Sequence, residues 1–289
     1  MSELLLAPLA YDFMQNALAV AVISAAVCGM LSCWLVLMGW SLMGEAVAHS
    51  VLPGVVLAFA LGIPLGIGAF VFGLLAVALI GALGQTTALK RETTIGVVFT
   101  TLFAAGLVLI STVTTSTHLQ HILFGNVLGT SRTDLYQVGA LAAVTVAVLL
   151  VKRRDFTLLA FDPTYAAAIG LRTGVLTAAL LGLLALTTVT ALQTLGVILV
   201  VAMLVIPGAT GFLVARSFPV MLIVATSAGA AAATIGVYTS YWWDVSTGGS
   251  IVLVAASLFG LAYLFSPRRG LAAQLLRRRR RRRARTRPA

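Results

Sequence analysis

Long runs of apolar residues, separated by short clusters of charge, Gly and Pro, dominate the chain. The runs cover residues 14–38, 44–62, 66–84, 93–113, 134–151, 175–192, 195–216, 219–239 and 248–265. Most approach the roughly 20 residues that an α-helix needs to cross a bilayer. Because lipid offers an open backbone no hydrogen-bond partner, each run is expected to be helical. The pattern predicts an all-α, polytopic transmembrane bundle of nine spans, or eight if the short second run, interrupted by Pro53, is not an independent crossing.

The composition agrees with a membrane protein. Of 289 residues, 60% are hydrophobic and 9% are charged, and the mean hydropathy is +1.07. An average soluble domain is roughly 25% charged. Nine arginines between Arg277 and Arg287 account for most of the net charge of +11, since the rest of the chain has 10 basic and 8 acidic residues. Beside a membrane span, such a tail favours contact with anionic lipid over binding of nucleic acid.

The basic residues also predict an orientation. If the N-terminus lies outside, 18 of the 19 Lys and Arg residues fall on the cytoplasmic side, and only Arg132 falls outside. Lys and Arg near span ends are retained in the cytoplasm. The expected organisation is therefore a short extracytoplasmic N-terminus over residues 1–13, a transmembrane domain over 14–266 and an Arg-rich cytoplasmic tail over 267–289.

Two ionisable side chains, Glu45 and His49, lie in the second apolar run. Their four-residue spacing places both on one face of a helix. A carboxylate oxygen with an imidazole nitrogen is a ligand pair suited to Mn²⁺, Fe²⁺ or Zn²⁺. Ionisable groups inside a membrane span mark functional sites, but this pair could instead bond a neighbouring helix and hold the bundle together. One pair is too few ligands for a selective site, whereas a two-fold dimer would supply four.

Two prolines inside apolar runs are candidate helix breaks and gating positions, Pro53 and Pro207. Pro53 lacks the N–H that would have bonded the carbonyl of His49, so it loosens the helix beside the Glu45–His49 pair. The freed carbonyl oxygen could join the coordination of a metal ion.

Two further histidines, His118 and His121, lie in the predicted outer loop between the fourth and fifth spans. Three-residue spacing could put both on one helix face. Exposed histidines are usually only surface residues, and metal handling is the alternative.

The longest cytoplasmic loop, about residues 155–174, contains a predicted short helix. Asp162 suits the N-cap, Pro163 suits the first helical position and Gly170 suits the far end. The loop is either a connector on the membrane surface or a docking element for a cytoplasmic partner.

Several catalytic motifs are missing from the sequence. It has no GxxxxGK[ST] phosphate loop, no HExxH pair and no GxSxG elbow. Those motifs supply ATP binding, zinc-dependent hydrolysis and acyl transfer. The chain itself is therefore not expected to bind or hydrolyse ATP, and these absences give no support for a membrane hydrolase.

Several segments resemble the integral membrane permeases of ATP-binding-cassette importers for manganese, zinc and iron. GEAVAHSVLPG, residues 44–54, is similar to the hallmark segment of that family, which usually has Asp where this chain has Glu45. Other similar segments cover residues 92–111, 123–129, 195–211 and 247–253.

This resemblance implies a homodimeric pathway in the bacterial cell membrane, a cytoplasmic ATPase partner and an extracytoplasmic metal-binding protein that delivers the ion. It assigns metal contact to Glu45 and His49, and no permanently bound cofactor. It assigns ATPase docking to the loop that holds Asp162, Pro163, Tyr165 and Gly170.

Two other functions remain open from the residues alone. The chain could be a self-sufficient metal carrier driven by an ion gradient, with Glu45 as the proton site. It could also be a membrane scaffold whose basic tail recruits acidic partners.

Overall fold

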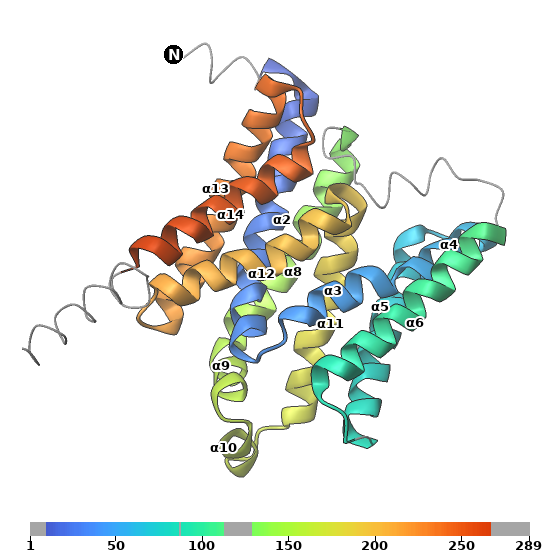
Figure 1. Ribbon diagram of the computed structural model, residues 1–289, viewed down its shortest axis with the longest axis vertical. Coiled ribbons are helices and arrows are strands. Elements are labelled where there is room, and N and C mark those ends of the chain that lie inside the picture. The colour runs from blue at the N-terminus through green and yellow to red at the C-terminus, as the bar shows by residue number, and fades with distance from the viewer. Residues whose placement is uncertain (1–9, 87, 113–128, 267–289) are drawn as a thin grey trace, which may run out of the picture.

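The computed structural model describes residues 10–86, 88–112 and 129–266 (Figure 1). Throughout these ranges the regular structure is helical. In chain order the helices are α2 (Asp12–Leu37), α3 (Ser41–Ser50), α4 (Leu52–Leu61), α5 (Leu65–Thr86), α6 (Arg91–Thr112), α8 (Arg132–Val151), α9 (Arg153–Phe161), α10 (Pro163–Ala168), α11 (Thr173–Leu195), α12 (Val197–Val214), α13 (Phe218–Trp243) and α14 (Thr247–Phe265).

Nine stretches of the described chain are long and apolar enough to cross a membrane. The second consists of α3 and α4 together, Ser41–Leu61, so the interrupted run does have the length of a crossing. Local signals explain several of the ends. Gly62 ends α4 in the left-handed conformation, at φ 67°, which costs glycine little. Ser131 begins α8 with a reciprocal capping box, in which its hydroxyl and the Asp134 carboxylate each bond the other residue's backbone N–H.

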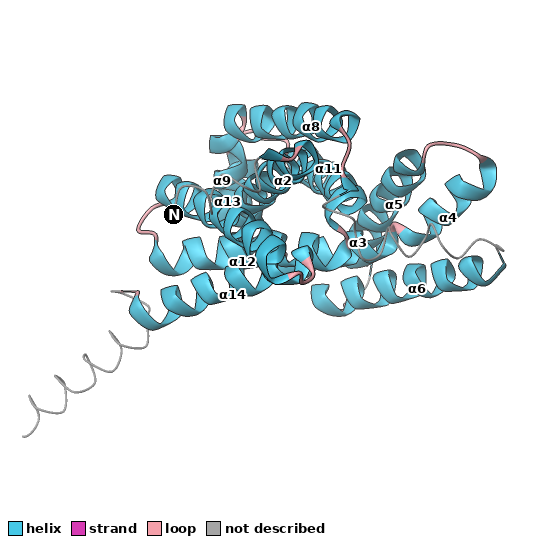
Figure 2. Ribbon diagram, turned by 90° about the horizontal axis from the view of Figure 1, so that it is seen from above, coloured by secondary structure: helices cyan, strands magenta, loops and turns pink. Residues whose placement is uncertain are grey.

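Helix α2 lies at the centre of the larger group of helices, in contact with α12, α13, α8 and α11. Helices α4, α5 and α6 form a second group to one side of it, visible in both views (Figures 1 and 2). Helix α3 joins the two groups, because it contacts α12 and α11 in the first and α5 and α6 in the second.

Small residues let α2 approach its neighbours closely. A Cβ added to Gly29 would lie 2.8 Å from the carbonyl oxygen of Ala225 on α13, and one added to Gly229 would lie 2.6 Å from that of Ala25 on α2. Such close approach is how helices gain packing energy in lipid, where the hydrophobic effect does not drive them together.

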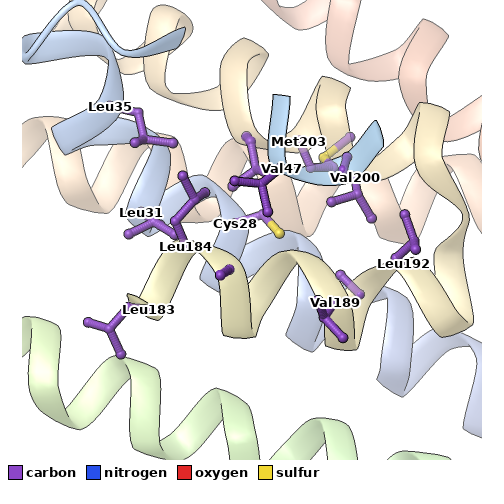
Figure 3. Close-up of a cluster of buried hydrophobic side chains, with 14 of the residues drawn as sticks. Cys28, Leu31, Leu35, Val47, Leu183, Leu184, Val189, Leu192, Val200 and Met203 are labelled. Carbon is purple, nitrogen blue, oxygen red and sulfur yellow. The ribbon is translucent and has the colours of Figure 1, made fainter. Parts of the chain in front are cut away.

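The centre of the bundle is filled by side chains from four helices, α2, α3, α11 and α12. Figure 3 shows Cys28, Val47, Leu184 and Met203 converging there. All four are fully buried. Cys28 and Cys33 are both free and buried in α2.

Apart from Glu45, the charged side chains of the described residues lie at the two ends of the bundle. Lys90 and Lys152 lie in the connections between helices, and Arg91 begins α6, at one end of the bundle, which we call the basic end. Helices α9 and α10 lie at the same end, at the lower edge of Figure 1. The opposite end carries the exposed pair of Asp12 and Arg132, whose charged atoms lie 3.7 Å apart. This separation follows the charge distribution of the sequence. That the basic end faces the cytoplasm stays a prediction.

Candidate functional site

Glu45 and His49 lie one turn apart on α3, and both are half-buried. His49 is eight residues from the start of the candidate span Ser41–Leu61, so it lies about 12 Å along the helix axis, near the middle of the span's length. The ion pairs of the described residues join Asp12 to Arg132 and Lys152 to Asp155, so Glu45 takes part in neither. Among the described residues of one chain, the Glu45 carboxylate therefore forms no ion pair.

The imidazole of His49 faces α6. Its ring centroid lies 5.2 Å from that of Phe103, edge-on, and 6.0 Å from that of Phe99. The Nδ1 atom is buried and has no hydrogen-bond partner among the described residues. Because Nδ1 is enclosed, Nε2 is the ring nitrogen that a cation can reach.

The space beside His49 is closed in this conformation. A cavity of about 10 Å³ touches His49, Phe103, Leu192 and Val197. A site needs at least about 10–15 Å³ to hold one water, so this one has no room for a hydrated ion. An ion must therefore reach His49 from its exposed side, or after the helices separate.

Segments that stood out in the sequence meet at this cavity. His49 comes from residues 44–54, Phe103 from residues 92–111 and Val197 from residues 195–211. The start of α14, from residues 247–253, lies beside the turn between α11 and α12, since a Cβ on Gly248 would be 3.8 Å from Leu199. The fold therefore brings three of the five segments to this cavity and places a fourth beside α12.

One chain supplies few metal ligands here. Within the described ranges, no group of three or more His, Cys, Asp or Glu side chains could hold a metal ion. The Glu45–His49 pair has the chemistry for Mn²⁺, Fe²⁺ or Zn²⁺, but it would fill only two of the four or more positions that these ions use.

The break beside the pair lies at Val51, between α3 and α4. Pro53 is buried in the first turn of α4, where its missing N–H does not interrupt that helix. Neighbouring glycines allow helices to enclose the break. A Cβ on Gly106 of α6 would lie 3.0 Å from the Pro53 nitrogen, and one on Gly54 would overlap the carbonyl oxygen of Gly68 on α5.

Pro207 lies inside α12, in the contact with α2 and α13. Ser32 on α2 bonds two backbone groups of α12 beside Pro207. Its hydroxyl accepts a bond from the N–H of Gly208 at 3.0 Å and donates to the carbonyl of Val205 at 3.4 Å. Helix α12 is continuous through Pro207, and Ser32 links this part of it to α2.

The predicted loop helix is present as α10. Asp162 caps it by accepting the N–H of Tyr165 at 2.8 Å, Pro163 is its first residue, and Gly170 follows it with φ 88°. The sequence interpretation missed α9, which precedes it and buries Phe156 against Trp34 of α2. Tyr165 is 55% exposed at the basic end, so α10 presents an aromatic side chain outside the bundle.

Two sequence predictions lie outside the described residues. These are the histidine pair His118 and His121, with most of segment 123–129, and the arginine-rich tail. Three residues with a structural role were missed. Phe99 and Phe103 are four residues apart on one face of a span, a spacing typical of ordinary packing, and Ser32 carries no signal beyond being polar in an apolar run.

Comparison with known proteins gives a consistent family. The model of the ABC 3 transport family matches residues 10–266. The manganese transport system membrane protein MntB of Synechocystis is 48% identical over 270 residues, covering 93% of this chain and 88% of the relative. The chelated iron transport system membrane protein YfeD of Yersinia pestis is 50% identical over 259 residues, covering 90% and 87%.

A solved structure has the same fold. A chain of PsaBC from Streptococcus pneumoniae, in complex with Fab, superposes with a TM-score of 0.85 at 38% identity, covering 93% of this chain and 97% of that one. The match extends over all nine candidate spans, because the family model runs from residue 10 to residue 266. The chain therefore belongs to the ABC 3 transport family, the integral membrane permease subunits of ATP-binding-cassette metal transporters.

Proposed function

We propose that this chain imports divalent transition-metal ions, manganese or iron foremost and zinc by the same ligand chemistry, as the permease subunit of an ATP-driven transporter. Two copies form the pathway in a bacterial cell membrane, with the C-terminus in the cytoplasm. An extracytoplasmic metal-binding protein delivers the ion, and a cytoplasmic ATPase subunit supplies the energy. The metal is the substrate, and the chain itself catalyses no covalent step.

The position of Glu45 and His49 is the main support for this proposal. They lie at the end of the first half of a broken helix, near mid-span, which is where transporters commonly bind their ions. One relative is named for manganese transport and another for chelated iron transport. Both metals bind oxygen and nitrogen ligands, as Glu45 and His49 would supply.

The number of ligands supports a dimer. A selective site needs more than the two side chains that one chain offers, and a two-fold axis beside α3 would bring two carboxylates and two imidazoles together. The closed cavity at His49 suits a pathway that opens only when the helices move. Alternating access then requires the ion to be held firmly enough to enter and loosely enough to leave.

The exposed helix α10 supports the ATPase contact. It lies at the basic end, is capped at Asp162 and is followed by Gly170. A short rigid helix with an exposed aromatic residue, Tyr165, can transmit movement from a partner into α11, which follows it in the chain.

Reconstitution tests this function directly. The chain is placed in liposomes alone, with its ATPase, or with its ATPase and the metal-binding protein, and uptake of radioactive manganese is followed. We expect uptake only from the complete system with ATP. Uptake by the chain alone, driven by a proton gradient, would instead establish the self-sufficient carrier.

A further inference from the structure

Helix α9 makes a contact with the spans that has no part in the metal site described above. The helix begins at Arg153, at the basic end, and leads directly into α10. Its Phe156 is fully buried, and the ring centroid lies 6.2 Å from that of Trp34 on α2, with the two rings edge-on. Helix α9 also contacts α8 and α11. The loop that holds α10 is therefore held against three spans through α9.

Trp34 connects α9 to the start of a further span. Its indole is fully buried, and the ring centroid lies 5.0 Å from that of Phe218, the first residue of α13, again edge-on. Aromatic pairs of this kind are stabilised beyond the area that they bury. The Trp34 N–H is buried without a hydrogen-bond partner among the described residues, so aromatic packing and not a polar bond sets the position of the ring. One side chain of α2 thus contacts both α9 and α13.

The direct connection from α10 to α11 is less closely packed. Gly170 follows α10 with φ 88°. A cavity of about 510 Å³ is lined by Pro163 of α10 and by Thr173, the first residue of α11. Part of α9 also borders this cavity, but Phe156 and Trp34 do not. Because closely packed side chains transmit a displacement and a cavity does not, the aromatic contact is the firmer route from the loop into the bundle.

The route continues from α2 towards the candidate metal site. Two residues before Trp34, the Ser32 hydroxyl accepts the N–H of Gly208 on α12 at 3.0 Å. Helix α12 in turn contacts α3, which carries Glu45 and His49. A displacement of α2 therefore reaches the metal pair through two helix contacts.

We propose that Phe156 and Trp34 are positioning residues for transport, which transmit movement of the ATPase-bound loop to α2 and α13 and so to the metal pathway. This role rests on the proposed function, because it requires an ATPase at α10. Neither side chain lies at the candidate metal site. The pair couples ATP hydrolysis in the partner to ion movement in this chain.

The test measures manganese ions imported per ATP hydrolysed by the full chain in liposomes, with its ATPase and the metal-binding protein. In Phe156→Ala we expect the ATPase to remain bound and active, because α10 and its cap at Asp162 are unchanged. The number of ions per ATP should fall roughly fivefold, within the range found for residues along coupling networks. Phe156→Leu keeps apolar bulk and loses the aromatic pairing, so its ratio should fall about twofold. The control is Met14→Ala, which removes a fully buried side chain at the opposite end of α2 and should leave the ratio unchanged.

Three results would overturn this role. One is a wild-type ratio in the Phe156 variants, and Phe156→Leu alone decides this if Phe156→Ala does not assemble. Another is an equal fall in Met14→Ala, which would make the effect one of stability alone. The third is loss of the ATPase from a folded Phe156→Ala chain, which would assign Phe156 to docking. A wild-type transporter that imports no manganese with ATP would instead contradict the proposed function. Gel filtration and the melting temperature show that each variant is folded.

Discussion

The imidazole of His49 on α3 and the phenyl ring of Phe103 on α6 meet edge-on, with their centroids 5.2 Å apart. This contact fixes the orientation of the ring whose nitrogen we assign to the metal. It also joins two segments separated in the chain by about fifty residues, so a movement of α6 changes the surroundings of His49 directly.

Phe103→Ala should therefore reduce metal uptake more than its cost in stability explains. Removing this half-buried ring should lower the free energy of unfolding by about 2 kcal/mol, roughly half of what a fully buried Phe→Ala substitution costs. The measurement is initial uptake per folded complex in liposomes. Phe259→Ala is the control, since this half-buried ring of α14 stacks on Tyr263, away from His49. Equal uptake defects in both variants would show that Phe103 acts only through stability.

The contact between α4 and α5 at Gly54 should not tolerate a side chain. A Cβ there would overlap the carbonyl oxygen of Gly68, so Gly54→Ala must separate the two helices. We expect the free energy of unfolding to fall by about 1–3 kcal/mol, as it does when a protein core is overpacked. Gly81→Ala on α5 is the control, because its Cβ would meet no atom within 4 Å. Thermal unfolding in detergent compares the two, and an unchanged melting temperature for Gly54→Ala would contradict the close approach.

Ser32 should stabilise the contact between α2 and α12 beside Pro207. Ser32→Ala removes the hydroxyl that accepts the Gly208 N–H and donates to the Val205 carbonyl inside this buried contact, at a cost of about 1–3 kcal/mol. In Ser257→Ala the lost hydroxyl bonds only the Leu253 carbonyl of its own helix, so stability should hardly change. Thermal unfolding distinguishes the two variants. A smaller fall in melting temperature for Ser32→Ala than for Ser257→Ala would show that Ser32 does not stabilise this contact.

The cap of α10 should matter for coupling to the ATPase. Asp162→Ala removes the acceptor for the Tyr165 N–H, which costs about 1 kcal/mol of helix stability, whereas Asp162→Asn keeps a capping oxygen. We expect the Ala variant to stimulate ATP hydrolysis by the partner less than wild type does, and the Asn variant to stimulate it nearly as well. If Asp162→Asn were as impaired as Asp162→Ala, the carboxylate charge and not the capping hydrogen bond would be the important feature.

Much of the fold could be predicted because lipid allows so few structures. Apolar runs of span length must be helices, and the nine runs match the nine candidate spans to within a few residues. The cap, first residue and end of α10 were also predictable, since Asp162, Pro163 and Gly170 each have a local conformational preference.

What could not be predicted depends on contacts between distant segments. The pairing of His49 with Phe103 and of Ser32 with Gly208 needs the packing of α3 on α6 and of α2 on α12. Phenylalanine and serine are common in membrane spans, so nothing local marks these two. Helix α9 was missed because its basic start, Arg153 and Arg154, suggested a loop at the membrane surface.

The central claim is that Glu45 and His49 hold the passing metal ion. Its most direct test is ATP-driven manganese uptake by the complete transporter carrying Glu45→Gln, which keeps the size of the side chain and removes its charge. We expect initial uptake to fall at least about tenfold, because even indirect partners of a metal site cost 10- to 100-fold when lost. Glu92→Gln, at the exposed start of α6, should retain wild-type uptake. Wild-type uptake by a correctly assembled Glu45→Gln transporter would contradict the account.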